Sequence, residues 1–290
     1  MSMTKYRAFV HTVELGSLTR AAEVMQYSQP GISKMMDSLE DELNLSLFVR
    51  KGPALELTEN GKQIYIYCKD IVRREDELIN AANAMNGLLT GTIRIGALNS
   101  IILEYTPNVI KTYSNAHPII QIFLDELSYA EIIDDLKNGT IDIGFTSKFS
   151  EKSLDFIPLF KDPIRLIVNK DHPLASCSKI PISALDNSDF ISLPPGGDDL
   201  LVVVRNRQKF TPINKYYVHS DAAAVAMVSA GLGVYIISEM QCRNLPDNVI
   251  KKEFEEDLFR VMGIGIKYTK NVSPTIKEMI RISKLQEDPR

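Results

Sequence analysis

Three side chains near the start of one predicted helix have the chemistry to read a nucleic acid. Gln29 and Ser33 are hydrogen-bonding groups, and Lys34 adds a cation. Ser28 is a good N-cap, and Pro30 falls in the first turn, where its missing N–H costs nothing. A helix with such groups at its N-terminal end can enter a DNA major groove tip-first, with its dipole and its free N–H groups near phosphate.

The opposite face of this helix is apolar. Its apolar residues recur at i, i+3, i+4 and i+7, the spacing of a helix that buries one face: Ile32, Met35, Met36 and Leu39. A second helix, over residues 18–25, begins after Gly16 with Ser17 as its cap, and only Gln26-Tyr27 separate it from Ser28. Two helices joined by so short a turn indicate a helix-turn-helix.

A further helix, over residues 5–15, precedes this pair, and a small hairpin follows it. Residues 44–49 return as an apolar segment, Arg50-Lys51-Gly52-Pro53 form a turn, and residues 54–57 alternate like a strand. The hairpin resembles a wing with two cations at its tip. A wing beside a recognition helix typically rests on phosphates.

Charge does not by itself favour nucleic acid, since the formal net charge is −4. The first 59 residues hold six cations, Lys5, Arg7, Arg20, Lys34, Arg50 and Lys51, against eight acids, Glu14, Glu23, Asp37, Glu40, Asp41, Glu42, Glu56 and Glu59. DNA binding must therefore rest on placement, with the acidic run 40–42 turned away from phosphate. Weak binding by one copy favours an oligomer.

Thr58 can cap a long helix that runs to about residue 85 and is roughly 40 Å long at about 1.5 Å per residue. Its apolar residues form one seam: Ile64, Tyr67, Ile71, Leu78, Ala82 and Met85. We expect a partner helix from a second subunit to bury this seam. The alternative is an ordinary amphipathic helix packed on its own domain. Residues 87–91 are a hinge-like break.

From residue 92 onward, strands and helices alternate, which predicts a parallel-type sheet with right-handed crossovers. The expected strands are 92–98, 119–124, 141–146, 156–160, 164–169, 190–193, 215–219, 234–237 and 258–268, and the expected helices are 100–114, 129–137, 198–210, 221–230 and 275–285. Boundaries near 161–163 and 264–266 suggest that the chain crosses twice between two lobes. The C-terminal helix then completes the first lobe, and the two lobes form a cleft that can close on a small ligand.

Residue patterns for catalysis or metal binding are missing from the sequence. It holds no GxSxG, GxGxxG or P-loop pattern, and the four histidines have no ligand spacing. Cys68, Cys177 and Cys242 form no CxxC and read as reduced thiols, with a redox pair of Cys177 and Cys242 as the alternative. Asp171-His172-Pro173 reads as a turn.

The chain resembles the LysR-type transcriptional regulators over essentially its whole length. The resemblance is densest in the winged helix-turn-helix and rests there on residues 14–23, 28–33, 39–40, 42–43, 47–48 and 57–58, with Phe9 and Val13. It continues at Asp142-Ile143-Gly144, at residues 171–175 and at residues 231–234.

The resemblance implies an α/β protein overall, with three parts. Residues 1–59 are the winged helix-turn-helix, 60–90 the dimerising linker helix and hinge, and 91–290 a periplasmic-binding-protein-like effector domain. Lobe I of that domain spans about 91–162 and 266–290, and lobe II about 163–265. The implied partners are double-stranded promoter DNA, a small-molecule effector, RNA polymerase and further copies of the chain in a dimer of dimers.

Site residues follow from the same resemblance. The base-reading candidates are Gln29, Pro30, Ser33 and Lys34; Arg50 and Lys51 fit phosphate contacts of the wing; and Ser17, Thr19 and Ser28 add hydroxyls that are alternatively helix caps. The family binds its metabolite where the first helix follows the first strand, here Asn99, Ser100 and Ile101. Candidates across the cleft are Ser128, Thr146, Ser192, Pro194, Gly196 and Gly197. A hydroxyl at a helix N-terminus suits a carboxylate or another anion.

We therefore expect a ligand-responsive regulator without a metal or cofactor, located in the cytoplasm at the nucleoid. The lack of a signal core at the N-terminus and of any run of about 18 apolar residues supports that location and argues against a membrane partner. Two alternatives remain. One is a regulator whose effector domain has lost its ligand, and the other is an enzyme built on the α/β lobes.

Overall fold

The computed structural model describes residues 2–51, 54–85, 90–194, 200–267 and 272–286. The chain divides into two compact units, Met1–Leu88 and Leu89–Arg290. Within the described ranges, no helix combines the length and the apolar composition needed to cross a membrane.

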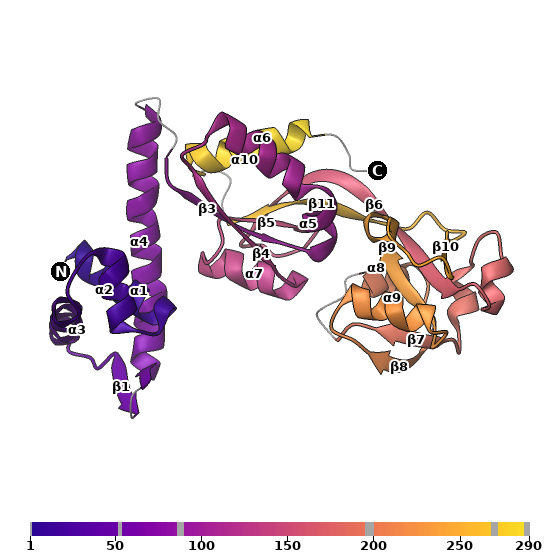
Figure 1. The fold of residues 1–290 in the computed structure, drawn as a ribbon, viewed down its shortest axis with the longest axis horizontal. Coiled ribbons are helices and arrows are strands. Elements are labelled where there is room, and N and C mark those ends of the chain that lie inside the picture. Colours follow the sequence, from indigo (N-terminus) through magenta and orange to yellow (C-terminus); the bar gives the residue numbers. More distant parts are fainter. Residues whose placement is uncertain (1, 52–53, 86–89, 195–199, 268–271, 287–290) are drawn as a thin grey trace. The chain divides into compact units, whose positions relative to one another are not determined.

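The first unit is a winged helix-turn-helix followed by one long helix. It holds the helices α1 (Met3–Leu15), α2 (Leu18–Met25), α3 (Gln29–Leu43) and α4 (Glu59–Met85) and the antiparallel strands β1 (Phe48–Lys51) and β2 (Ala54–Leu57) (Figure 1). These bounds confirm the helices and the hairpin that the sequence predicts. Gly52 and Pro53, at the predicted wing tip, lie outside the described residues.

Short polar side chains set where these helices begin. The Ser17 hydroxyl accepts from the backbone N–H of Arg20 at 3.3 Å, and the Ser28 hydroxyl accepts from that of Gly31 at 3.2 Å. The Thr58 hydroxyl does the same for Gly61 at 2.8 Å. Each bond satisfies one of the N–H groups that a helix start leaves unpaired. The three predicted caps are therefore confirmed.

One core holds the first unit together, and α4 contributes to it. Phe9, Ile32, Leu39 and Leu47 are completely buried there. The α4 residues Cys68 and Val72 are buried against the same cluster, and Ile64 and Tyr65 pack at its margin. The far part of α4 behaves differently, because Leu78 is 70% exposed. The long helix thus packs on its own domain along its first half and leaves apolar residues open beyond it.

The second unit is an α/β structure with two lobes. Its strands are β3 (Thr92–Ala97), β4 (Gln121–Glu126), β5 (Ile143–Ser147), β6 (Asp155–Asn169), β7 (Asp189–Ser192), β8 (Ile213–Tyr217), β9 (Tyr235–Ser238), β10 (Val249–Lys252) and β11 (Phe259–Ile266). Its helices are α5 (Asn99–Glu104), α6 (Thr106–Ala116), α7 (Tyr129–Asn138), α8 (Leu200–Arg207), α9 (Asp221–Ser229) and α10 (Pro274–Leu285), with 3₁₀ turns at Pro173–Ser176, Ile182–Leu185 and Glu239–Cys242.

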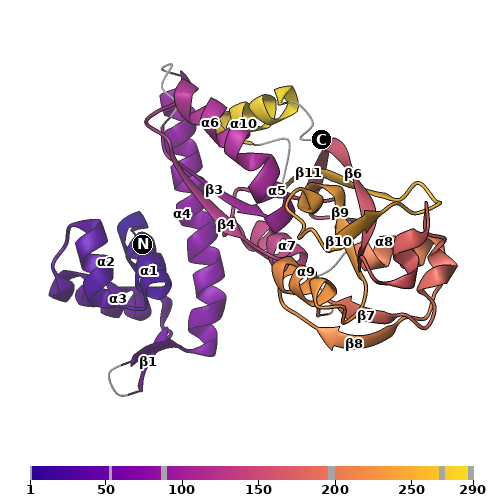
Figure 2. The same cartoon turned by 45° about the vertical axis from the view of Figure 1, so that its right-hand side comes forward.

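The main sheet is mixed rather than wholly parallel. Its order is β10-β6-β11-β5-β3-β4, and β9 also pairs with β6. β3 is parallel to both β4 and β5, whereas β11 is antiparallel to β5 and β6. Helices α6 and α10 lie side by side on one face of the first lobe's sheet, and α7 covers the other (Figure 1 and Figure 2). The predicted completion of this lobe by the C-terminal helix is confirmed.

Two strands carry the chain between the lobes, as the two predicted crossings require. The first core includes Met262 and Ile264 of β11, and the second includes Ile164 of β6 and Leu258, which precedes β11. The return into the first lobe therefore lies near residue 258, earlier than the sequence suggested. Figure 1 shows β6 running from one lobe into the other.

Three details of the predicted elements were wrong. The expected helix 100–114 is two helices, because Pro107 lacks an N–H and occupies the first turn of α6. The expected strands 156–160 and 164–169 are one strand, β6, because β11 continues to pair with it through Asp162 and Pro163. Strand β10 and the 3₁₀ turns Ile182–Leu185 and Glu239–Cys242 were not predicted.

A row of glycines lets α7 lie close to the sheet. Gly96, Gly144 and Gly265 are cross-strand neighbours on β3, β5 and β11. A Cβ atom at Gly144 would meet Cγ2 of Ile132 at 2.5 Å, and one at Gly265 would meet Cδ1 of Leu136 at 2.9 Å. Both of those side chains come from α7, so the helix occupies the space that larger residues in the row would need.

We expect Gly144→Ala to lower the free energy of unfolding by about 1–3 kcal/mol, because the added methyl overpacks the contact with Ile132. Denaturant unfolding of the full chain measures the loss. Ile132→Ala makes room, so the double variant should be less destabilised than the two single effects added together. Strict additivity of the two substitutions would contradict the close approach of α7.

Candidate nucleic-acid interface and ligand site

The phase of α3 determines which of its residues face outward. Ile32, Met36 and Leu39 are buried in the core of the first unit. Gln29, Pro30 and Lys34 are consequently exposed, and Ser33 is half-buried. The four base-reading candidates therefore share the accessible side of the first turns of α3.

The remaining DNA candidates fall into two groups. Ser17 and Ser28 are helix caps, as described above, and Thr19 is exposed in the first turn of α2. Arg50 and Lys51 end β1, where their backbones pair with Leu55 and Ala54 of β2. Both cations thus belong to the predicted wing, while the placement of their side chains lies outside what the structure describes.

Acids near α3 are engaged within the unit. The Glu40 carboxylate accepts from the backbone N–H of Phe48 at 3.0 Å, and also from that of Leu47, so it holds the segment that leads into β1. The Lys5 ammonium donates to Glu42, and this hydrogen bond lowers the pKa of the Glu42 carboxyl. Two acids of this run therefore stabilise contacts inside the unit, and the expectation that the run faces away from phosphate stays a prediction.

Ion pairs join α1 to α4. Nη2 of Arg7 lies 2.8 Å from Oε2 of Glu75 and 2.6 Å from Oδ1 of Asp76. Burial alone would lower the pKa of the Arg7 guanidinium, but the hydrogen bonds to Asp76 and Glu75 outweigh burial and raise it. Lys69 pairs with Glu14 at 3.3 Å further along the same two helices. These contacts fix the direction in which α4 leaves the winged helix-turn-helix.

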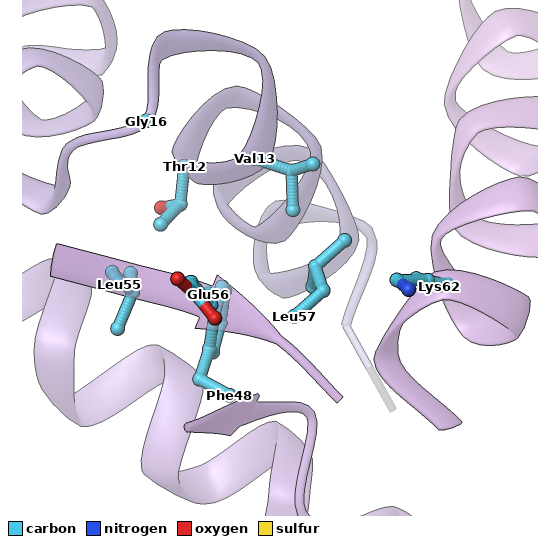
Figure 3. Close-up of a pocket in the computed structure, with 8 residues that line it drawn as sticks. All are labelled: Thr12, Val13, Gly16, Phe48, Leu55, Glu56, Leu57 and Lys62. Carbon is cyan, nitrogen blue, oxygen red and sulfur yellow. The ribbon is translucent and has the colours of Figure 1, made fainter. Parts of the chain in front are cut away.

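A pocket of about 370 Å³ lies between the end of α1, the hairpin and the start of α4 (Figure 3). It is lined by Thr12, Val13, Gly16, Phe48, Leu55, Glu56, Leu57 and Lys62. The Thr12 hydroxyl donates to the carbonyl of Ala8 at 2.7 Å, and Lys62 bonds to Glu59 at 2.6 Å. Two of its polar groups thus already have partners in the protein. None of the predicted effector residues lines this pocket.

The first group of effector candidates lies at the carboxyl edge of the first lobe's sheet. Ser100 and Asn99 open α5 directly after β3, and Thr146 is near the end of the neighbouring parallel strand β5. The carboxyl edge of parallel strands is where open α/β sheets bind ligands. Ser100 is 3% exposed, and its hydroxyl accepts from Nη2 of Arg260 at 2.7 Å. Asn99 donates to Glu126 at 3.1 Å.

Two hydroxyls at this edge lack a partner among the described residues. The Oγ1 atom of Thr146 and the Oγ atom of Ser147 are buried, and within the described part of the chain neither forms a hydrogen bond. Buried polar groups are nearly always hydrogen-bonded, so such atoms indicate a place for a bound molecule or water. Thr146 is thus the predicted effector residue whose hydroxyl is most available.

Other effector candidates have structural roles or lie elsewhere. The side chain of Ile101 is completely buried in the first core. Ser128 forms a capping box with Glu131 at the start of α7, and its hydrogen bonds lower the pKa of the Glu131 carboxyl. Ser192 ends β7 in the second lobe and donates to Oδ1 of Asn214 at 3.1 Å.

The cross-cleft group is only partly described. Pro194 is half-buried just after β7, whereas Gly196 and Gly197 lie outside the described residues. As far as the structure describes the chain, no hydrogen bond joins Ser192 to Ser100 or Thr146. The first group of candidates is therefore brought together at one edge, and its closure by the second lobe remains a prediction.

Arg260 is the residue at this edge that the sequence interpretation missed. It lies on β11 directly opposite Asp162 of β6, and it reaches Ser100 as well. The signal that could have found it is an isolated arginine within the apolar run Phe259-Arg260-Val261-Met262. A charged residue in a buried strand requires a partner.

The contacts and burial of the cysteines and His172 indicate structural rather than chemical roles. All three cysteines are unpaired thiols, and burial raises the pKa of Cys242 to about 12 and that of Cys68 to about 11. A high pKa disfavours the reactive thiolate, which weighs against the redox alternative. The His172 ring accepts from the backbone N–H of Leu174 at 3.2 Å, and burial lowers its pKa. The expected turn at His172 is confirmed.

A winged helix-turn-helix with an exposed α3, followed in the chain by a two-lobed α/β unit, defines a class of DNA-binding transcriptional regulators. Residues 3–62 match the family model of bacterial regulatory helix-turn-helix proteins of the lysR family, and residues 86–285 match that of the LysR substrate binding domain. The chain belongs to the LysR family of transcriptional regulators.

Similar proteins cover most or nearly all of the chain. The HTH-type transcriptional regulator YvbU of Bacillus subtilis is 28% identical over 98% of both chains, and the transcriptional dual regulator GltC of the same organism is 27% identical over 82% of this chain and 81% of its own. A full-length OxyR variant from Pseudomonas aeruginosa has the same fold, with a TM-score of 0.79 at 23% identity over 98% of this chain and 95% of its own. CbnR complexed with its target DNA gives a TM-score of 0.68 at 19% identity over 98% of this chain and all of its own.

Ser28 offers a test that separates helix capping from closeness to DNA. Ser28→Ala should lower the free energy of unfolding by about 1 kcal/mol, because the cap is removed. Ser28→Asp keeps a good cap but brings a negative charge to the tip of α3. It should therefore retain stability in thermal unfolding while weakening DNA binding in fluorescence anisotropy.

Ser220→Asp is the matched control, because Ser220 caps α9 in the second unit. This substitution should leave DNA affinity unchanged. If the Ser28→Asp and Ser220→Asp variants bind DNA with equal affinity, Ser28 does not lie at the DNA interface.

Proposed function

We propose that the chain recognises specific duplex promoter DNA through the N-terminal turns of α3. Gln29, Pro30, Ser33 and Lys34 would meet base edges in the major groove, and residues 50–51 of the wing would rest on phosphates. The observation that carries the proposal is the buried face of α3, which turns these residues to the outside. Lysine presents a point charge rather than a fork, so Lys34 suits guanine or phosphate.

We further propose that α4 joins two copies of the chain, and that two dimers form a tetramer. Tyr67 is 68% exposed, Ile71 40% and Leu78 70%, and these residues follow the predicted seam. Apolar side chains at this spacing need a partner surface, and the same helix of a second copy supplies one. Pairing also doubles the number of DNA contacts, which suits a unit with few cations. Residues 1–59, 60–90 and 91–290 would then act as reader, linker and effector domain.

The second unit is proposed to bind a small polar or anionic molecule, such as a carboxylate, at the edge that holds Asn99, Ser100 and Thr146. The Thr146 hydroxyl is buried and has no hydrogen-bond partner in the part of the chain that the structure describes, which supports this placement. Cleft closure between the lobes would change the geometry of the tetramer on DNA and its contact with RNA polymerase. A regulator of this kind acts in the cytoplasm at the nucleoid and performs no catalysis.

A second candidate is a regulator with a ligand-independent second unit. The Ser100 hydroxyl is already engaged by Arg260, which favours this reading. A thermal-shift screen of small carboxylates separates the ligand-binding regulator from the ligand-independent one. A ligand at 100 times its Kd raises the free energy of unfolding by about 2.7 kcal/mol. If one ligand stabilises the protein, Ser100→Ala should weaken that response without affecting DNA binding.

Lys34→Ala should weaken DNA binding and, if Lys34 meets phosphate, reduce the slope of log K against log salt by about 1 for each phosphate that is no longer neutralised. If Lys34 instead reads guanine, the discrimination against a changed base should fall by about 1–3 kcal/mol. Anisotropy titrations over a salt series measure both. Lys111→Ala, an exposed cation of α6, is the control and should change neither. If Lys34→Ala changes neither the salt slope nor the base discrimination, Lys34 does not contact the DNA.

Leu78→Glu should break the proposed dimer, because it places a charge in the seam of α4. Sedimentation equilibrium should show a smaller oligomer, together with weaker DNA binding. Leu285→Glu on α10 is the matched control, since Leu285 is also 70% exposed. Retention of the original mass by the Leu78→Glu variant would contradict pairing through this seam.

A further inference from the structure

A buried ion pair lies where the two lobes meet. Asp162 is completely buried and Arg260 is 6% exposed. Oδ2 of Asp162 accepts from Nε of Arg260 at 3.0 Å and from Nη2 at 2.9 Å. The two residues are directly opposite each other on β6 and β11. Removing one charge would leave the other buried without compensation, so neither can be released without a substitute.

The pair occupies the crossing point itself. On one side of it along the strands, Met262 of β11 belongs to the first core, and on the other side Ile164 of β6 belongs to the second. Both connections between the lobes thus pass through these two positions. A rotation of one lobe against the other has to bend β6 and β11 close to the ion pair.

Contacts of the pair reach α5 and the turn that follows β9, where Met240 is itself buried in the first core. Nη2 of Arg260 donates to the Ser100 hydroxyl at 2.7 Å, which ties it to α5 of the first lobe. Oδ1 of Asp162 accepts from the backbone N–H of Met240 at 3.3 Å. Met240 lies in the 3₁₀ turn Glu239–Cys242, which follows β9, a strand paired with β6.

We propose that Arg260 is a positioning residue that clamps α5 to the crossing point between the lobes. Ser100 is then the end of a connection that runs through Arg260 to Asp162 and to the turn after β9. A molecule that forms a hydrogen bond with the Ser100 hydroxyl competes with Arg260 for it. Its binding would therefore change the contacts of β6 and β11, the two strands that join the lobes. The last step rests on the proposed ligand site, whereas the clamp itself does not.

A second ion pair links the same elements and provides a control. Arg243, just after the 3₁₀ turn, pairs with Glu104 of α5, but the Arg243 side chain is 54% exposed. Exposed pairs contribute little to stability because water screens them. The buried Arg260 contacts are therefore expected to hold α5, and the Arg243 pair is not.

Hydrogen exchange of the full chain, without ligand or DNA, tests the clamp. Arg260→Met should speed amide exchange in α5 and in residues 239–242 by roughly fivefold or more and leave that of α7 unchanged, because the opening is local. The double variant Arg260→Met/Asp162→Leu removes both charges, so it should recover the thermal stability of the parent while α5 still exchanges fast. Arg243→Met should exchange like the parent.

Ser100→Ala tests the same contact independently if the single Arg260 variant fails to fold, because it removes only the Ser100 hydroxyl. It should also speed exchange in α5. Exchange in α5 at the parental rate in both the double variant and Ser100→Ala would overturn the proposal. A uniform rise across α5, α7 and α9 would overturn it as well, because the pair would then serve general stability. Neither result depends on whether a ligand binds.

Discussion

The rotation of α3 about its own axis is the constraint on which the proposed DNA-reading surface depends. Burial of Ile32, Met36 and Leu39 fixes that rotation, because each has to enter the core that α1, α2 and α4 also line. A helix has one degree of freedom of this kind, so fixing three residues of one face fixes the other face too. Gln29 and Lys34 are outward for that reason, and the Ser28 cap sets where their helix begins.

Several acids of the first unit are engaged by partners inside the unit. Glu40 holds the backbone that leads into β1, Glu42 bonds to Lys5, and Glu14 pairs with Lys69. Each of these carboxylates is held in place by a hydrogen bond or an ion pair within the unit. A charge count treats all acids as equally close to the ligand, whereas an electrostatic footprint depends on which charges remain unpaired on the binding face.

Local features were predictable from sequence because their causes are local. Ser17, Ser28 and Thr58 cap their helices through bonds to residues three positions away, and the apolar spacing of α3 and α4 reflects the helix period. The continuity of β6 through Asp162 and Pro163 was missed, because it depends on pairing with β11, about a hundred residues later. Arg260 was missed for the same reason, since a long-range partner makes its burial possible.

Two of the predicted effector residues lie together at one edge of the sheet, but the contacts of each side chain were not predictable from sequence. Ser100 and Thr146 come together because β3 and β5 are parallel neighbours. Ser128 and Ile101 sit at the same edge, but capping and core packing use them. Tertiary contacts determine which hydroxyls remain free to bond a ligand. Those contacts cannot be derived from one sequence alone.

Selection of duplexes from a random pool by the full chain tests the reading role of α3 most directly. We expect enriched sequences to contain two related half-sites, as a paired reader requires. The Gln29→Ala variant should enrich the same half-sites with relaxed preference at one position, because the shortened side chain can no longer bond to a base edge. Enrichment of no sequence by the parent chain, or an identical preference in the variant, would contradict base reading by this face of α3.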